Sequence, residues 1–240
     1  MLLAIDLGNT RAKAAVFEGK RILAQVSVEL LRAAPEIDAF SEKFPGITNA
    51  VCTSVGTQQL PMLKNVIVQQ VSRDWKFPFV NLYGTPETLG IDRMVLASGA
   101  ALAHPGCNTL VIDAGTCITY DFIDDCANYH GGAISPGLSM RYRALHDFTA
   151  KLPLVTPDAP GSFTGKSTRE AINSGVVNGL VAELEAFMDH YRAAGNFIII
   201  LTGGDSEFLA GRLKNRIFAN PNFLLESLNR LFQYQITNDQ

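Results

Sequence analysis

Residues 1–10 read MLLAIDLGNT, an apolar run that ends in a carboxylate, a glycine and two small polar residues. Residues 2–5 are continuously apolar, which predicts a strand covered on both faces at the centre of a sheet. Gly8 allows a ligand to approach the main chain, and the N–H groups of such a turn can hold phosphate. Asp6 would hold a hydrated divalent metal that bridges carboxylate and phosphate. An ordinary turn between strands is the alternative, since Gly and Asn are common in turns.

The same pattern recurs in the middle of the chain, where residues 109–116 read TLVIDAGT. Each copy is followed by two more strand-like segments, residues 12–17 and 21–28 in the first half and residues 117–123 and 130–134 in the second. Each half is therefore predicted to begin with a three-strand meander. If the halves face each other, their Asp-x-Gly turns form opposite walls of one cleft that can hold a nucleotide's phosphates and a metal.

Composition narrows the class of protein. The 240 residues are 47% hydrophobic and carry a net charge of −3. A chain of this length forms one or two domains with a sizeable core. The absence of a Lys/Arg run argues against nucleic acid as a partner. No apolar stretch approaches the roughly 18 residues that a membrane span needs, so we expect a cytoplasmic protein with no membrane partner. The four cysteines lack C-x-x-C spacing, which favours reduced, buried thiols.

Helix and strand patterns alternate after each meander, which favours parallel strand pairing across helical crossovers. The predicted helices cover residues 35–44, 58–73, 91–104, 138–146, 168–194 and 223–234, with a further helix after the turn at 202–205. The predicted strands between them cover residues 48–55, 77–82 and 197–201, and residues 152–165 form a loop rich in Pro and Gly. The fold class is therefore α/β.

Residues 161–168, GSFTGKST, resemble a phosphate-binding P-loop but do not match it. Three residues separate Gly161 from Gly165 where that motif requires four, and no predicted strand precedes them. We expect Ser167 or Thr168 to cap the following helix instead, with Thr168 facing the cleft. No G-x-G-x-x-G occurs in the chain, which removes the usual dinucleotide-binding signal.

Residues 83–93, YGTPETLGIDR, end where a helix is predicted to begin. Asp92 and Arg93 place a carboxylate and a guanidinium side by side at that helix N-terminus, where backbone amides favour an anion. Arg93 can bind a carboxylate through two hydrogen bonds, and Asp92 can accept the proton of a hydroxyl that attacks phosphorus. The alternative is a solvated Asp–Arg pair that only caps the helix.

Five motifs follow one another along nearly the whole chain: DLGNT at 6–10, GIDR at 90–93, DAGT at 113–116, GGAISPG at 131–137 and TGGD at 202–205. In this order they resemble the type III pantothenate kinases. The resemblance implies the fold of the acetate kinase, sugar kinase, Hsp70 and actin superfamily. Two ribonuclease H-like domains, residues 1–107 and 108–240, would each contain a mixed sheet that opens with a three-strand meander and is flanked by helices.

The resemblance also implies an activity. It is the ATP-dependent phosphorylation of pantothenate to 4'-phosphopantothenate, the first step of coenzyme A biosynthesis, with magnesium and a monovalent cation, potassium or ammonium, as cofactors. It further implies a homodimer with the substrate pocket at the subunit interface. We expect the helix at 91–104 to form a symmetric subunit contact, because its small residues permit close approach.

Site residues follow from the same resemblance, position by position. The residues implied to bind ATP are Asp6, Leu7, Gly8, Asn9, Thr10, Arg11, Ala12, Lys13 and Thr116. Those implied to bind pantothenate are Tyr83, Gly90, Ile91, Asp92, Arg93 and Thr168. Asp92 would be the catalytic proton acceptor, Asp6 would serve magnesium and Asp113 would bind the monovalent cation. Gly203 and Gly204 would border the adenosine.

Two alternatives remain open. Another small-molecule kinase or a phosphatase of the same superfamily would keep both Asp-x-Gly turns, and only the segment around residues 90–93 favours pantothenate over other substrates. A non-catalytic accessory or regulatory factor of this family is the second alternative. The presence of Asp92 and of both turns argues against it.

Overall fold

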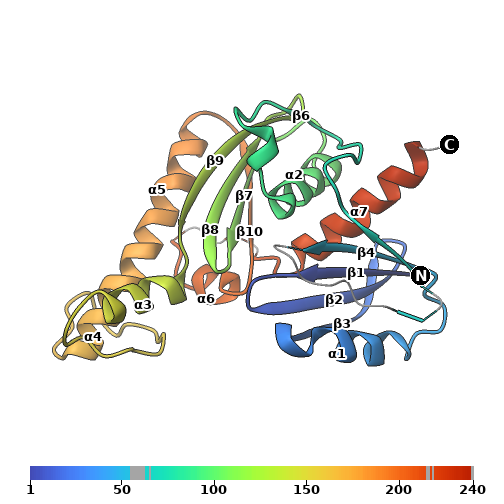
Figure 1. Ribbon diagram of the computed structural model, residues 1–240. Helices are drawn as coiled ribbons and strands as arrows, with labels where there is room; N and C mark the ends of the chain where they lie inside the picture. The colour runs from blue at the N-terminus through green and yellow to red at the C-terminus, as the bar shows by residue number, and fades with distance from the viewer. Residues whose placement is uncertain (55–62, 65, 215–216, 218, 239–240) are drawn as a thin grey trace. The chain divides into compact units, whose positions relative to one another are not determined.

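A computed structural model describes residues 1–54, 63–64, 66–214, 217 and 219–238 (Figure 1). The chain forms two compact units. The first unit comprises Met1–Gly106, Ile123–Gly131 and Asn222–Gln240, and the second comprises Cys107–Phe122 and Gly132–Pro221. The break after Gly106 lies next to the predicted boundary, but the segments 123–131 and 222–240 pack with the first unit. The division into two ribonuclease H-like domains at residue 107 stays a prediction.

The first sheet has the strand order β3-β2-β1-β4-β5. Its strands are β1 (Leu2–Leu7), β2 (Arg11–Glu18), β3 (Arg21–Glu29), β4 (Asn49–Ser54) and β5 (Ile67–Gln70). The first three form the predicted antiparallel meander, while β4 pairs with β1 and β5 with β4 in parallel. The sheet is therefore mixed, and β1 lies at its centre as predicted.

Strand β1 is covered on both faces because its side chains alternate between two apolar clusters. Leu3 and Ile5 pack in a cluster that includes Ile37 of helix α1 (Ala33–Ser41). Leu2 and Ala4 pack in another, which includes residues of helices α2 (Ile91–Ala103) and α7 (Phe223–Asn238). This confirms the interpretation of the continuous apolar run at residues 2–5.

Helices α2 and α7 approach each other closely within the first unit. A side chain at Gly99 would overlap the hydroxyl of Ser227 and lie 3.1 Å from its Cα. Every residue of α2 from position 93 to position 100 is buried. The small residues of α2 therefore pack inside the chain, and the expected subunit contact is wrong for the face that carries Gly99.

The second sheet has the order β10-β7-β8-β9-β6. Its strands are β7 (Asn108–Ala114), β8 (Cys117–Ile123), β9 (Asn128–Pro136), β10 (Phe197–Thr202) and the two-residue β6 (Val80–Asn81). Strands β7, β8 and β9 form the second predicted meander. Strand β10 pairs with β7 in parallel, and β6 pairs with the first residues of β9 in parallel.

The second unit contains the helices α3 (Leu138–Asp147), α4 (Thr168–Asn173), α5 (Gly179–Ala193) and α6 (Ser206–Ala210). The predicted helix at 168–194 is continuous except for a π-helical segment at Ser174–Asn178 between α4 and α5. The hydroxyl of Ser167 accepts the backbone N–H of Glu170 at 3.3 Å, which confirms Ser167 as the helix cap. Two short 3-10 helices occur in the first unit, at Leu30–Arg32 and Pro86–Thr88.

Two predicted elements are wrong. Residues 67–70 form edge strand β5 instead of part of a helix at 58–73, because consecutive β-branched residues at 66–68 favour a strand. Residues 58–62 and 65 lie outside the described part of the chain. The strand predicted at 77–82 shrinks to β6, since Pro78 cannot donate a backbone hydrogen bond.

All four cysteines are free, but only Cys52 is buried; Cys107 and Cys117 are half-buried and Cys126 is exposed. Within the described residues, no helix combines the length and apolar character that crossing a membrane requires.

Candidate active site

Asp6 lies at the end of β1 and shares one face of the first sheet with two polar neighbours. The strand register places Lys13 of β2 and Thr53 of β4 beside it, and paired residues point to the same face. Asp6 and Lys13 are half-buried, and Thr53 is fully buried. Helices α2 and α7 cover this face, so Asp6 and the helix that carries Asp92 lie on the same side of the sheet.

The environment of Asp6 fits a hydrated magnesium ion. The Oγ1 atom of Thr53 is buried and has no hydrogen-bond partner among the described residues. An unsatisfied buried hydroxyl is costly, and a water of a hydrated cation held by Asp6 would satisfy it. Burial, together with the negative charge of Asp6, raises the pKa of Cys52 to about 12. The Cys52 thiol therefore stays neutral, and it packs in the apolar cluster on the opposite face of the sheet.

The turn after Asp6 is exposed at its tip, whereas Leu7 and Ala12 on its two sides are buried. The N–H of Gly8 donates to the carbonyl of Arg11 at 3.1 Å, and Asn9 and Thr10 are exposed. The side chains of Leu7 and Ala12 lie in the core, so their predicted contacts with ATP can only be made by their main chain. The guanidinium of Arg11 donates to the hydroxyl and the carbonyl of Ser27 on β3, at 3.0 and 2.9 Å.

Asp92 is fixed at the start of α2 by its own backbone neighbour. Its Oδ1 accepts the N–H of Arg93 at 2.9 Å. Gly90, the N-cap residue, leaves room for this carboxylate, because a side chain at Gly90 would overlap Oδ1. Asp92 and Ile91 are half-buried. The carboxylate thus sits in the first helical turn, where the helix dipole favours negative charge.

Arg93 and Tyr83 are brought together in the first unit. The guanidinium carbon of Arg93 lies 5.6 Å from the centroid of the Tyr83 ring, which allows a cation–π interaction. Arg93 is buried, so the alternative of a solvated Asp–Arg pair is wrong. Gly131, with φ of +92°, lies beside the same ring, and a side chain there would come within 2.8 Å of it. The first residue of the motif GGAISPG therefore lies against the Tyr83 ring.

In the second unit, three of the motifs meet at the end of β7. Asp113 pairs in register with Thr202, and a side chain at Gly203, with φ of +97°, would overlap the Asp113 carboxylate. The N–H of Asp205 donates to the carbonyl of Ala114 at 3.0 Å. The N–H of Gly137 donates to the carbonyl of Thr116 at 3.2 Å. DAGT, GGAISPG and TGGD thus form one local site, which explains the glycines in the last two.

Several site features were not predicted from the sequence. Thr53 belongs to no recognisable motif, and only the pairing of β4 with β1 shows that it lies beside Asp6. Asp205 ends the motif TGGD, and burial raises the pKa of its carboxyl.

Two predicted site residues are exposed: Thr168 at the start of α4, and Thr116 in the turn after β7. The proposed contacts of both with ligands stay predictions, as does the placement of Asp6 and Asp113 in one cleft.

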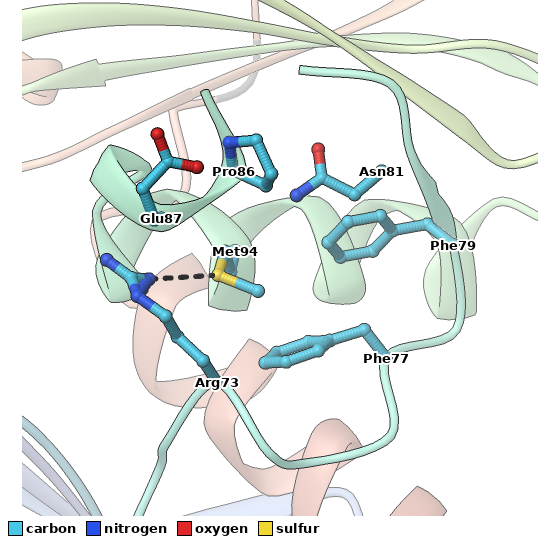
Figure 2. Close-up of a pocket in the computed structure, with 7 residues that line it drawn as sticks. All are labelled: Arg73, Phe77, Phe79, Asn81, Pro86, Glu87 and Met94. Atoms are coloured by element: carbon cyan, nitrogen blue, oxygen red, sulfur yellow. Dashed lines mark hydrogen bonds between the residues drawn. The ribbon is translucent and has the colours of Figure 1, made fainter. Parts of the chain in front are cut away.

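A pocket of about 350 Å³ lies in the first unit beside the segment that carries Tyr83 (Figure 2). Its lining residues are Arg73, Phe77, Phe79, Asn81, Pro86, Glu87 and Met94. None of them is a predicted site residue. Met94 follows Asp92 by two positions on α2, which turns it about 200° around the helix axis. The pocket therefore lies on the far side of α2 from Asp92, and we assign it no part in catalysis.

Comparison with known proteins identifies the family of the chain. The sequence model of the family Type III pantothenate kinase matches residues 2–190. A type III pantothenate kinase from Flavobacterium johnsoniae is 57% identical over the full length of both chains.

Solved structures support the fold. A conserved putative Baf family transcriptional activator from Campylobacter jejuni is 21% identical, with a TM-score of 0.62 over 98% of this chain and 99% of that one. A putative 2-dehydro-3-deoxygalactonokinase from Sinorhizobium meliloti is 14% identical, with a TM-score of 0.53 over 98% and 99% of the two chains. These likenesses confirm the predicted α/β fold of two mixed sheets flanked by helices. Through its matched family model and its full-length relatives, the chain belongs to the type III pantothenate kinase family.

Proposed function

We propose that this protein phosphorylates pantothenate with ATP to give 4'-phosphopantothenate, the first step toward coenzyme A. The observation that carries the proposal is the 57% identity over the full length of an enzyme that bears this name. The site geometry agrees with it, because Asp6, Lys13 and the helix that carries Asp92 in its first turn share one face of the first sheet.

Asp92 acts as the proton acceptor in this proposal. The primary hydroxyl of pantothenate attacks the γ-phosphorus of ATP, its proton passes to the Asp92 carboxylate, and ADP leaves. Phosphoryl transfer depends mostly on positioning the reactants and on neutralising charge. The base therefore takes up the hydroxyl proton late in the transfer step. The hydrogen bond from Arg93 N–H to Oδ1 holds the carboxylate in place and leaves Oδ2 for the substrate.

The nucleotide would be held by the turn of residues 6–13 and by Thr116. Lys13 and the N–H groups of the turn would bind phosphate oxygens. Asp6, with Thr53 beside it, would hold magnesium, which neutralises charge on the phosphates when bound. Asp113, held against Gly203, would bind a monovalent cation, potassium or ammonium.

Pantothenate would contact Tyr83, Gly90, Ile91, Arg93 and Thr168, in a pocket at the interface of a homodimer. The burial of Arg93 beneath Tyr83 suggests that Arg93 orients the ring and reaches the substrate only at the edge of its guanidinium. This refines the carboxylate clamp that the sequence suggested.

An acceptor panel tests the proposal. The purified protein is incubated with magnesium and ATP, and ADP release is measured with pantothenate, with hexoses, with N-acetylmannosamine and with acetate. We expect turnover with pantothenate only, with the product confirmed by mass spectrometry. Preference for another acceptor would make the protein a different kinase of the superfamily. Nucleotide binding without turnover of any acceptor would favour the regulatory alternative. The likeness to a putative Baf family transcriptional activator does not favour that alternative, because at 21% identity it shows the fold alone.

A further inference from the structure

Four polar side chains in the second unit form a network that joins two strands to two helices. Arg141 of α3 donates through Nε to the carbonyl of Pro136 and through Nη2 to the hydroxyl of Ser135, each at 2.9 Å. The same Nη2 contacts the carboxylate of Glu183 on α5 at 2.5 Å. The hydroxyl of Tyr120 on β8 donates to the other oxygen of Glu183 at 2.9 Å.

The network is shielded from water. Arg141 and Glu183 have side-chain exposures of 21% and 24%, and Tyr120 is fully buried and stacked on Phe187 at 3.9 Å. Burial would raise the pKa of Glu183, but hydrogen bonds from Arg141, Ser135 and Tyr120 outweigh it and lower that pKa. The carboxylate is therefore charged at neutral pH and strongly bound. Charge-assisted pairs of this kind are stronger and more directional than exposed ones.

The network ends at the turn of the motif DAGT. Arg141 holds the carbonyl of Pro136, and the next residue, Gly137, donates its N–H to the carbonyl of Thr116 at 3.2 Å. A side chain at Gly137 would overlap the carbonyl oxygens of both Gly115 and Thr116. The backbone at Gly137 thus lies directly against the turn, and a small shift of Gly137 displaces Thr116.

We propose that Arg141 and Glu183 are positioning residues for nucleotide binding, which act on the turn at Gly115 and Thr116 through Gly137. The proposal rests on the proposed function, which assigns the nucleotide to that turn. Neither side chain touches the ligand. Their ion pair clamps the end of β9, so that the turn keeps its shape when no nucleotide is bound and binding costs no reordering.

The test compares Arg141→Lys, Arg141→Met and Glu183→Gln with the unmodified protein. Lysine keeps the positive charge at position 141. It cannot hydrogen-bond Pro136, Ser135 and Glu183 at the same time, because it lacks the planar guanidinium group with its several N–H donors. The dissociation constant of a non-hydrolysable ATP analogue is measured by calorimetry in the presence of magnesium, and KM is measured for both substrates. For Arg141→Met we expect the dissociation constant and the KM of ATP to rise about tenfold, the size of one lost charged hydrogen bond. The KM of pantothenate should change less than about twofold.

Glu185→Gln is the matched control. Glu185 lies two positions further along α5 and pairs with Lys214 at 3.2 Å, but the lysine is 86% exposed and the pair does not reach β9. Glu185→Gln should therefore leave the dissociation constant of the ATP analogue unchanged. Equal nucleotide affinity in all four variants and the unmodified protein would overturn the inference. So would a parallel rise in both KM values, which indicates general loosening. If the unmodified protein itself fails to bind the analogue, the proposed function fails instead.

Discussion

At the scale of single residues, the proposed role of Asp92 as proton acceptor depends on how its carboxylate is oriented. One carboxylate oxygen is occupied by the N–H of Arg93, and Gly90 leaves the space for it. Asp92→Asn preserves this shape but removes the proton acceptor, so kcat should fall by about 10² to 10⁴. Nucleotide affinity and melting temperature should stay at the values of the unmodified protein, which calorimetry and thermal denaturation measure. If the variant kept more than about a tenth of the kcat, Asp92 would be a helix cap and the base would lie elsewhere.

Thr53 offers a second prediction at this scale. Its fully buried hydroxyl has no partner among the described residues, and it sits beside Asp6 in the register of β1 and β4. Thr53→Val keeps the shape and removes the hydroxyl, so the melting temperature should stay or rise. The magnesium concentration needed for half-maximal binding of an ATP analogue should increase several-fold, whereas Thr53→Ser should behave like the unmodified protein. An unchanged magnesium requirement in Thr53→Val would mean that the buried hydroxyl is unsatisfied and has no part in magnesium binding.

The sequence could predict these residues only in part. Asp6, Asp92 and Asp113 could be singled out because they lie in motifs, and the roles assigned to them stay predictions. The burial of Arg93 could not be predicted, since it depends on the packing of α2 inside the first unit. The network of Arg141 and Glu183 joins residues 42 positions apart, a separation that no local pattern predicts.

At the scale of secondary structure, the alternating patterns predicted most helices and strands. The meanders were predictable because their turns are short and their strands locally paired. Helix 91–104 was predictable because Gly90 and Pro105 bound it, and helix 138–146 because Pro136 and Gly137 precede it. Strand β5 was not predicted, because the β-branched residues at 66–68 are too short a signal by themselves and so short an edge strand also depends on its pairing with β4. Helix α7 was predicted as a helix, but its packing with the first unit is a long-range contact.

Gly99 gives the prediction at this scale. Alanine is the better helix former by about 1 kcal/mol, yet here its methyl group would overlap Ser227 of α7. Gly99→Ala should therefore lower the unfolding free energy by about 1–3 kcal/mol, the usual cost of overpacking. Denaturant unfolding measures it. Gly179→Ala, where an added methyl group meets nothing within 4 Å, is the control and should be neutral or stabilising. If both substitutions stabilised, α2 and α7 would be less tightly packed than the structure indicates.

At the scale of the whole molecule, the proposed machinery is divided between the two units. The first unit holds Asp6, Lys13 and Asp92, and the second holds Asp113, Thr116 and Gly203. Asp6 and Asp113 occupy corresponding places near the end of the first strand of each meander, whereas Asp92 on α2 and Gly203 after β10 lie outside the meanders. The repetition seen in the sequence is thus a repetition of structure, which is why the paired motif was a better guide to the fold than either copy alone.

The homodimer is the last prediction, and exposed aromatic side chains of the second unit support it. Phe148 and Phe163 are 88% and 85% exposed, on the segment between α3 and α4. Large apolar side chains in water commonly mark a contact with another chain, and burial of one phenylalanine contributes about 1.5–3 kcal/mol. We therefore expect a dimer in solution whose dissociation constant rises about tenfold or more when Phe148→Ser and Phe163→Ser are combined.

Sedimentation velocity over a range of protein concentrations measures this dissociation, and pantothenate kinetics at the same concentrations shows its consequence. If the substrate pocket is shared between subunits, the KM of pantothenate should rise as dimers dissociate, while nucleotide affinity stays constant. Leu31→Ser, which changes a side chain that is 98% exposed in the first unit, is the control and should leave the dimer intact. A monomer with full activity would contradict the shared pocket.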